Sequence, residues 1–295
     1  MQARSVALGL IVGLLLGGVA GRVAFDDAPG PPQRGAAADA ESCSRLQAPI
    51  SDKELTDRCY LVWAHAPNSL FANTYLGVNT LQNPLDAWVT HEIIHERKPA
   101  FILDVGTYRG GSAALWATYL EEVDPNGRVI SIDIEDQVTT AKDLPIVKRR
   151  VDFVVGSSTD PALVAEIGKR IEGREVLVIL DSLHTKENVY NELVAYSPYV
   201  KKGGYIIVQD TPLDRYTPEA LRAEGYTSEM IDAFNSWIAS RPFAGLYFRL
   251  QESHGKSAGA GVAAFLETTD EFVIDKGRER HILTNNWNGY LRRVK

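Results

Sequence analysis

The apolar positions of the chain alternate between two spacings. Short continuous apolar runs with the length of strands occur at Phe101–Val105, Val129–Ile134, Phe153–Val155, Val176–Leu180 and Tyr205–Val208. Between them, apolar residues recur at helical spacing in Gly111–Val123, Pro161–Ile171 and Lys186–Val200. Buried strands that alternate with helices predict a mostly parallel sheet covered on both faces, which is a doubly wound, Rossmann-like α/β fold.

The flanking regions have a less regular pattern. Residues 51–83 are irregular and partly helical, and a helix is expected at Asp86–Glu96. After a long connection at 212–225, the pattern predicts a helix at Ser228–Ser240 and strands at Phe272–Ile274 and His281–Thr284. We therefore expect residues 51–295 to form one domain with an N-terminal helical extension.

The N-terminus has a pattern of its own. Ser5–Gly21 is uncharged and, as a helix, would be about 25 Å long, close to the thickness of a hydrocarbon core. Residues 1–24 are therefore predicted to be a membrane anchor or a cleaved signal peptide. Residues 25–50 are rich in proline, glycine and alanine, which predicts a flexible linker. We favour a single-pass anchor. Arginines flank the segment on both sides, so the side of the membrane stays open.

Composition and charge narrow the choice of partners. Hydrophobic residues make up 45% and charged residues 23% of the 295 residues, as in ordinary globular proteins. The net charge of −7 argues against nucleic acid as the main partner, because no basic excess exists to neutralise phosphates. Cys43 and Cys59 could form a disulfide in an oxidising compartment or remain thiols, so the cysteines leave the compartment open.

The loop after the first strand carries the strongest motif. In Asp104-x-Gly106-x-x-x-Gly110, glycines allow the backbone to approach a ligand closely, and the next helix directs free N–H groups toward it. The spacing differs from that of dinucleotide sites and suits a cofactor without phosphates. A glycine turn can also serve only to pack a helix against a strand. The predicted cofactor residues are Asp104, Gly106, Thr107, Gly110, Gly111 and Ser112.

Asp133 follows at the end of the second strand. A carboxylate in this place can accept hydrogen bonds from both hydroxyls of a ribose, although an acid here can also be a helix cap or a simple loop residue. Together the glycine loop and Asp133 predict a site for S-adenosylmethionine.

Two further acids end the fourth and fifth strands. Asp181 and Asp210 should lie at one edge of the sheet, because parallel strands end on the same side. Two repelling carboxylates favour a divalent cation such as Mg²⁺, with the amide oxygen of Gln209 as a further ligand, although both acids could instead cap helices. His184 lies three residues after Asp181 and could take a proton from a substrate hydroxyl, or be only a surface group.

Several motifs occur in an order that is typical of one family. They are Tyr75-Leu-Gly77, Pro84-Leu-Asp86-Ala-Trp88, the loop Asp104–Ser112, Leu180-Asp-Ser-x-His184, Gly204-Tyr-x-x-Val-x-Asp-Thr211 and Gly289-Tyr-Leu-x-Arg293. In these motifs the chain resembles the cephalosporin hydroxylase and rhamnosyl O-methyltransferase family, from about Tyr75 to Lys295.

The resemblance implies a class I methyltransferase fold, S-adenosylmethionine, Mg²⁺ as in related sugar methyltransferases, and a homo-oligomer. Residue by residue, it implies that Asp104, Gly106 and Gly110 line the cofactor, Asp133 binds its ribose, and Asp181 and Asp210 hold the metal. One departure is Gln209, where the family often has a glutamate before the aspartate. Losing one charge should weaken Mg²⁺ binding.

We therefore expect an S-adenosylmethionine-dependent O-methyltransferase, assisted by Mg²⁺, that acts on a hydroxyl of a sugar, glycoconjugate or related natural product. His184 or Asp181 would take the proton. One alternative is a membrane-tethered cofactor-binding or scaffold protein that has lost turnover, which Gln209 favours. Another is an oxidative, hydroxylase-like role, against which stands the lack of a two-histidine, one-carboxylate iron motif.

Overall fold

The computed structural model describes residues 52–64, 72–239 and 255–295. Among these residues the longest helix, Pro84–Arg97, has 14 residues and is about 21 Å long, shorter than a hydrocarbon core of about 30 Å. No described helix is long and apolar enough to cross a membrane, which contradicts the predicted single-pass anchor. The segment behind that prediction, Ser5–Gly21, lies outside the described residues, as do the predicted linker and Cys43.

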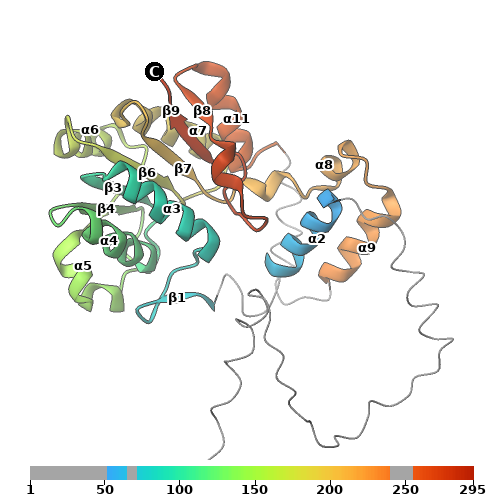
Figure 1. The fold of residues 1–295 in the computed structure, drawn as a ribbon, viewed down its shortest axis with the longest axis horizontal. Helices are drawn as coiled ribbons and strands as arrows, with labels where there is room; N and C mark the ends of the chain where they lie inside the picture. The colour runs from blue at the N-terminus through green and yellow to red at the C-terminus, as the bar shows by residue number, and fades with distance from the viewer. Residues whose placement is uncertain (1–51, 65–71, 240–254) are drawn as a thin grey trace, which may run out of the picture. The chain divides into compact units, whose positions relative to one another are not determined.

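The centre of the fold is a 7-stranded sheet with the order β5-β4-β3-β6-β7-β9-β8 (Figure 1). Five neighbouring strands are parallel: β5 (Val151–Val155), β4 (Arg128–Asp133), β3 (Phe101–Val105), β6 (Val176–Leu180) and β7 (Tyr205–Val208). The last strand, β9 (Tyr290–Arg293), runs antiparallel to both β7 and β8 (Phe272–Ile274). This arrangement confirms the doubly wound, mostly parallel sheet.

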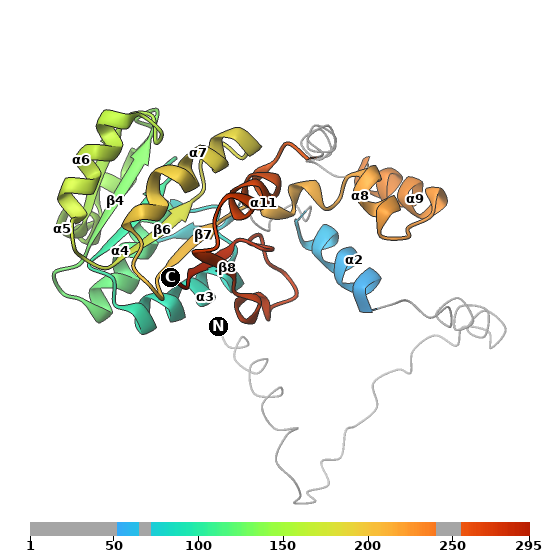
Figure 2. The same ribbon diagram turned by 90° about the horizontal axis from the view of Figure 1, so that it is seen from above.

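Helices cover both faces of the sheet (Figure 2). One face packs against α3 (Pro84–Arg97), α4 (Gly111–Val123) and α5 (Pro145–Arg150), and the other against α6 (Pro161–Ile171), α7 (Lys186–Tyr196) and α11 (Ala258–Thr268). Every residue of β3 and of β6 is buried, as expected for strands covered on both faces. Short 3-10 turns lie at Thr140–Asp143, Ser197–Tyr199, Thr211–Asp214 and Lys276–Glu279.

Local sequence signals explain where several helices begin. Asn83 caps α3 by accepting from the N–H of Leu85, with Pro84 in the first turn. Asp160 caps α6 in the same way, and Thr185 caps α7 by accepting from the N–H of Asn188. These caps place the loops that precede the helices at the carboxyl edge of the sheet.

A smaller helical cluster joins the N-terminal extension to the segment after β7. It consists of α2 (Asp52–Ala64), α8 (Pro218–Ala223) and α9 (Ser228–Ala239), which lie side by side in both views (Figures 1 and 2). The buried carboxylate of Asp57 accepts hydrogen bonds from Arg215 Nη2 at 2.7 Å and from the hydroxyl of Tyr226 at 2.6 Å. Cys59 is exposed on α2 and forms no disulfide with any described residue.

The C-terminal region differs from its prediction. His281–Thr284 is not a strand but a bent segment that wraps over the start of α3. Its backbone oxygen at Leu283 accepts from Asn83 Nδ2, and the next N–H, of Asn285, donates to Asp86. The segment β1–β2 (Thr74–Tyr75 and Val78–Asn79), together with α5, α8, α11 and β9, was not predicted.

Candidate functional site

A cavity of about 690 Å³ opens at the carboxyl ends of the parallel strands. Its first part, the glycine-loop half, is lined by the loops after β3, β4 and β5, which contribute Gly106, Thr107, Tyr108, Asp133, Ile134, Ser157 and Ser158. Its second part, the carboxylate half, is lined by Tyr60, Gln82, Asp181, His184, Gln209, Asp210, Tyr216 and Asn285. The site thus lies where ligands bind in doubly wound folds.

The glycine loop is shaped by close backbone contacts. Gly106 has φ +111°, and a Cβ at this position would lie 2.1 Å from the backbone oxygen of Asp181. At Gly111, a Cβ would lie 2.2 Å from the backbone oxygen of Asn79, which belongs to β2. No larger residue fits at either position, so the glycines here permit packing between segments as well as access for a ligand.

Among the predicted cofactor residues, Gly106, Thr107, Ser112 and Asp133 line the cavity, whereas Asp104, Gly110 and Gly111 do not. Asp104 is 1% exposed and accepts hydrogen bonds from Trp116 Nε1, Ser112 Oγ and Ser131 Oγ. Burial raises the pKa of Asp104 to about 6, even though these hydrogen bonds lower it. Asp104 therefore connects β3 to α4 and β4 behind the cavity wall.

Asp133 lies at the wall of the glycine-loop half. Its Oδ2 accepts from the backbone N–H of Tyr108 at 2.8 Å, and its Oδ1 accepts from the N–H of Glu135 at 3.2 Å. These bonds hold the carboxylate against the glycine loop while leaving lone pairs on both oxygens for a ligand.

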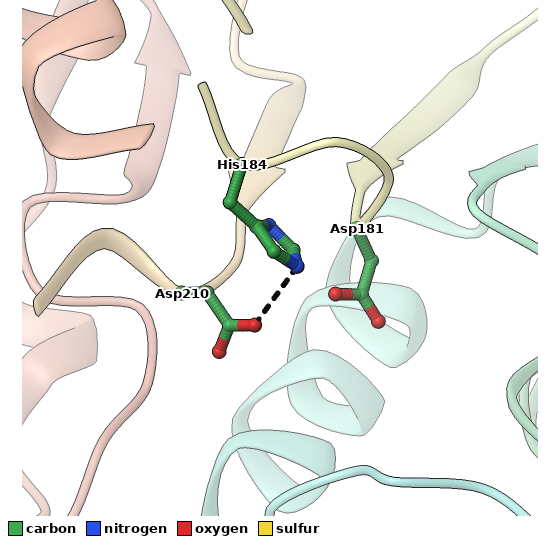
Figure 3. Close-up of side chains that lie close together, drawn as sticks. All are labelled: Asp181, His184 and Asp210. Carbon is green, nitrogen blue, oxygen red and sulfur yellow. Dashed lines mark ion pairs between the residues drawn. The ribbon is translucent and has the colours of Figure 1, made fainter. Parts of the chain in front are cut away.

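Asp181, His184 and Asp210 come together in the carboxylate half (Figure 3). One possible ligand atom from each of the three lies within 4.8 Å of the others, and His184 Nε2 lies 3.1 Å from Asp210 Oδ2. Asp210 adopts a left-handed backbone conformation with φ +55°, which is uncommon outside glycine and is tolerated best by Asn and Asp. The imidazole points into the space between the two carboxylates (Figure 3).

A buried amide pair borders Asp181. Gln209 Nε2 donates to Gln82 Oε1 at 2.7 Å, and Gln82 Nε2 donates to Gln209 Oε1 at 3.0 Å. Gln82 Nε2 also donates to Asp181 Oδ2 at 3.0 Å, and with its terminal amide turned over, Gln209 would donate to the same oxygen at 2.7 Å. The two amides thus form a hydrogen-bonded pair that contacts the carboxylate of Asp181.

Electrostatics at Asp181 favour a bound cation in this half of the cavity. Burial, followed by the charges of Asp210 and Asp104, raises the pKa of Asp181 well above its usual range. The donor set around it consists of two carboxylates, an amide oxygen and an imidazole. Oxygen-rich sets of this kind fit a divalent cation such as Mg²⁺. Gln82 was not predicted, because nothing in the sequence links it to residues 99 positions away.

Three residues to which the sequence analysis assigned no role complete the carboxylate half. The hydroxyl of Tyr60 donates to Asn285 Oδ1 at 3.0 Å, and its ring stacks on that of Tyr216 with centroids 5.1 Å apart. Burial, and then the nearby Tyr216 and Asp210, raise the pKa of Tyr60 well above its usual range, so its hydroxyl keeps its proton. No local motif marks Tyr60 or Tyr216.

Asp86 holds Asn285 in place. Its buried carboxylate accepts from the N–H of Asn285 at 2.7 Å, and from Thr284 Oγ1 and the hydroxyl of Tyr290 at 2.5 and 3.0 Å. Burial raises the pKa of Asp86 to about 6, because these bonds only partly offset the loss of solvent. The start of α3 thereby fixes the C-terminal loop at the rim of the cavity.

Comparison with known proteins gives one family. Residues 68–244, more than half of the chain, match the model of the family Rhamnosyl O-methyltransferase/CmcI. A rhamnosyl O-methyltransferase of Mycobacterium tuberculosis is 29% identical over 160 residues, which are 52% of this chain and 63% of that protein. One of Mycobacterium leprae is 28% identical over 193 residues, 64% of this chain and 79% of that protein.

The chain therefore spans less than two thirds of the length of the first of these relatives. Among solved structures, CmcI described as its Mg–SAM form has a TM-score of 0.47 and 19% sequence identity. That match covers 79% of this chain and 84% of the CmcI chain.

Proposed function

Because the chain belongs to the Rhamnosyl O-methyltransferase/CmcI family, as its motifs predicted, we propose that it is an S-adenosylmethionine-dependent O-methyltransferase. Its acceptor is a hydroxyl of a sugar, glycoconjugate or related natural product, in line with the names of its relatives. The observation that carries the proposal is a single cavity in which a glycine loop and Asp133 face Asp181, His184 and Asp210. Residues 51–295 form the catalytic domain in this proposal.

In the glycine-loop half, the proposed binding of S-adenosylmethionine uses the backbone of the glycine loop and the carboxylate of Asp133. The first N–H groups of α4 suit the negative charge of the methionine carboxylate. The free lone pairs of Asp133 suit the two ribose hydroxyls. Asp104 acts here through Ser112, by fixing the start of α4.

In the carboxylate half, Asp181, Asp210 and the oxygen of Gln209 are the proposed metal ligands. The closeness of Asp181, His184 and Asp210, each of which offers one ligand atom within 4.8 Å of the others, supports this assignment. A bound Mg²⁺ would lower the pKa of a coordinated hydroxyl and fix its orientation. Gln82 holds the amide of Gln209 in the position that this requires.

Methyl transfer to a hydroxyl releases one proton, so the chain must hold two reactants in line and accept that proton. His184 Nε2 faces the space between the carboxylates and is the proposed base (Figure 3). Asp210 Oδ2, at 3.1 Å, stabilises the imidazolium that forms. The ring of Tyr60, stacked on Tyr216, closes this half of the cavity from the side of α2.

The test is methyl transfer by the full chain to a panel of sugars and glycoconjugates, followed by mass spectrometry with and without Mg²⁺. We expect a product heavier by one methyl group. Asp181→Ala should abolish turnover, whereas Asp143→Ala, at a side chain that is 87% exposed and outside the cavity, should not. Wild-type turnover by Asp181→Ala would contradict the metal assignment.

A second function, cofactor binding without turnover, is favoured by one observation. Gln209 replaces a charged ligand and forms a neutral pair with Gln82, which weakens the attraction for a cation. Calorimetry with S-adenosylmethionine decides between the two functions. Tight binding without methyl transfer to any member of the panel supports the second function. The oxidative alternative lacks support, since the metal-ligating cluster among the described residues has one histidine where such iron sites use two.

A further inference from the structure

A buried carboxylate lies behind the wall of the glycine-loop half. Glu192, on α7, has no exposed surface, and its Oε1 accepts hydrogen bonds from Ser158 Oγ at 2.5 Å and from Ser182 Oγ at 2.6 Å. Its Oε2 has no hydrogen-bond partner among the described residues. A buried carboxylate with an unpartnered oxygen is costly, so its presence behind a ligand cavity needs an explanation.

The two serines line the cavity, and Glu192 determines how their hydroxyl groups are oriented. A hydroxyl has one proton, and in both serines that proton points at Glu192. Only lone pairs then remain for a ligand. Asn188 Nδ2 donates to Ser182 Oγ at 3.1 Å, which leaves Ser158 Oγ as the freer acceptor.

The position of Ser158 is fixed from a second side. The hydroxyl of Tyr196, a fully buried residue on α7, donates to the backbone oxygen of Ser158 at 2.7 Å. The loop after β5 is thereby tied to the same helix as Glu192. Hydroxyl direction and backbone position are both set before any ligand binds, which is the property of a preorganised recognition site.

The sheet order shows which part of a cofactor would meet Ser158. Asp133 ends β4, the acids Asp181 and Asp210 follow β6 and β7, and β5 lies on the opposite side of β4. With the ribose at Asp133 and the methyl group toward the two acids, the base extends toward β5 and Ser158. Ile134, 69% exposed and lining the cavity there, offers an apolar surface for a flat ring.

We propose that Glu192 is a positioning residue that orients Ser158 Oγ so that it can only accept a hydrogen bond from a ligand. The site thereby selects a 6-aminopurine, whose amino group donates, over a 6-oxopurine, whose oxygen accepts. The inference rests on the proposed function, because it takes S-adenosylmethionine as the ligand. Without the carboxylate, the serine hydroxyls could turn, so that they accept from a 6-amino group or donate to a 6-oxo group. Glu192 then decides specificity without touching the ligand.

The test compares the affinities of S-adenosylhomocysteine and S-inosylhomocysteine by calorimetry. The full-length wild type should prefer the adenosyl ligand about tenfold or more. The inosyl ligand loses one hydrogen bond, and its 6-oxo oxygen faces another acceptor. Glu192→Met should bring the two affinities to within about threefold. Glu192→Gln, which keeps an acceptor oxygen, should retain the wild-type ratio.

A purely structural role for Glu192 would lower both affinities together and leave their ratio unchanged, and that result in Glu192→Met would overturn the inference. Ser158→Ala provides a second variant in case Glu192→Met does not fold, and the ratio should fall there as well. If the wild type binds both ligands equally, the inference is wrong while the proposed function stands. If it binds neither, the proposed function itself is wrong.

Discussion

The two halves of the cavity are built in different ways. In the glycine-loop half, Gly106, Asp133 and Ser158 lie at or just after the ends of β3, β4 and β5 and take their places from these strands. In the carboxylate half, Asp181 and Asp210 follow strands in the same manner, but their neighbours come from elsewhere. Tyr60 and Asn285, for example, are hydrogen-bonded across 225 positions.

One cavity can therefore combine a half whose residues are placed by neighbouring strand ends with a half whose residues come from segments far apart in the sequence. The first part needs only the sheet, because strand ends of a parallel sheet meet at one edge. The second needs α2, the segment before α3 and the C-terminal loop to dock together, and buried groups such as Asp57 and Asp86 hold them. Substitutions in the two halves should therefore have separable effects.

The largest expected effect separates chemistry from cofactor binding. Asp210→Asn removes the charge that faces His184 and one proposed metal ligand, and should lower kcat by about 10² to 10⁴-fold. The affinity for S-adenosylmethionine should change less than about threefold, since Asp210 lies in the other half. Kinetics and calorimetry on one preparation measure both. An equal loss of cofactor affinity would contradict the division into halves.

The next effect concerns stability and pH. The folded pKa of Asp104 is about 6, above its ordinary value of 3.8, so the folded state binds more protons than the unfolded state between these values. The free energy of unfolding should therefore fall as pH rises from about 4 to 7, by on the order of 3 kcal/mol from this group. Denaturant unfolding of wild type and Asp104→Asn measures it, because the variant should lack this part of the decrease.

Asp86 is the counterpart of Asp104 at the carboxylate half, because burial raises its pKa as well. Asp104→Asn should be tolerated, since the hydroxyls of Ser112 and Ser131 can rotate to accept from the new amide. Asp86→Asn should be more damaging at pH 7. Its oxygen must stay where Asn285 and Asn83 donate, so its nitrogen would face the hydroxyls of Thr284 and Tyr290. Both hydroxyls already accept from Asn286, which makes them poor acceptors for a further donor. Equal unfolding midpoints for the two variants would count against this reading.

A smaller effect is expected from the ribose contact. Asp133→Ala should weaken binding of S-adenosylmethionine by about 10 to 100-fold, as expected for loss of hydrogen bonds to a charged group. With saturating cofactor, kcat should stay within about threefold of wild type. A large loss of kcat at saturation would mean that Asp133 acts on the methyl group's position rather than on affinity.

The smallest effect tests the long-range contact. Tyr60→Phe removes the hydrogen bond to Asn285 but keeps the ring stack, and should raise the KM for the acceptor about fivefold. Tyr190→Phe, outside the cavity, is the control. The affinity for S-adenosylmethionine should be unchanged in both variants. A lower affinity in Tyr60→Phe alone would show that α2 also supports the glycine-loop half.

Sequence patterns and structure agree best where signals are local. The strands at Phe101–Val105, Val176–Leu180 and Tyr205–Val208 have their predicted bounds, as do the helices Gly111–Val123 and Pro161–Ile171. The strand expected at His281–Thr284 fails for a physical reason. Its apolar residues suggest a strand, but its backbone groups bond to Asn83 and Asp86 at the start of α3 instead of a neighbouring strand.

The sequence by itself determined the parallel sheet, the glycine loop and the acids at the strand ends, because strand and turn propensities act over a few residues and parallel strands must share an edge. Only the tertiary structure decided that Gln82 pairs with Gln209, that Tyr60 reaches Asn285, and that Glu192 orients two serines. Those contacts depend on how distant segments pack, and packing selects side chains by shape and hydrogen bonding in space, which no spacing along the chain records.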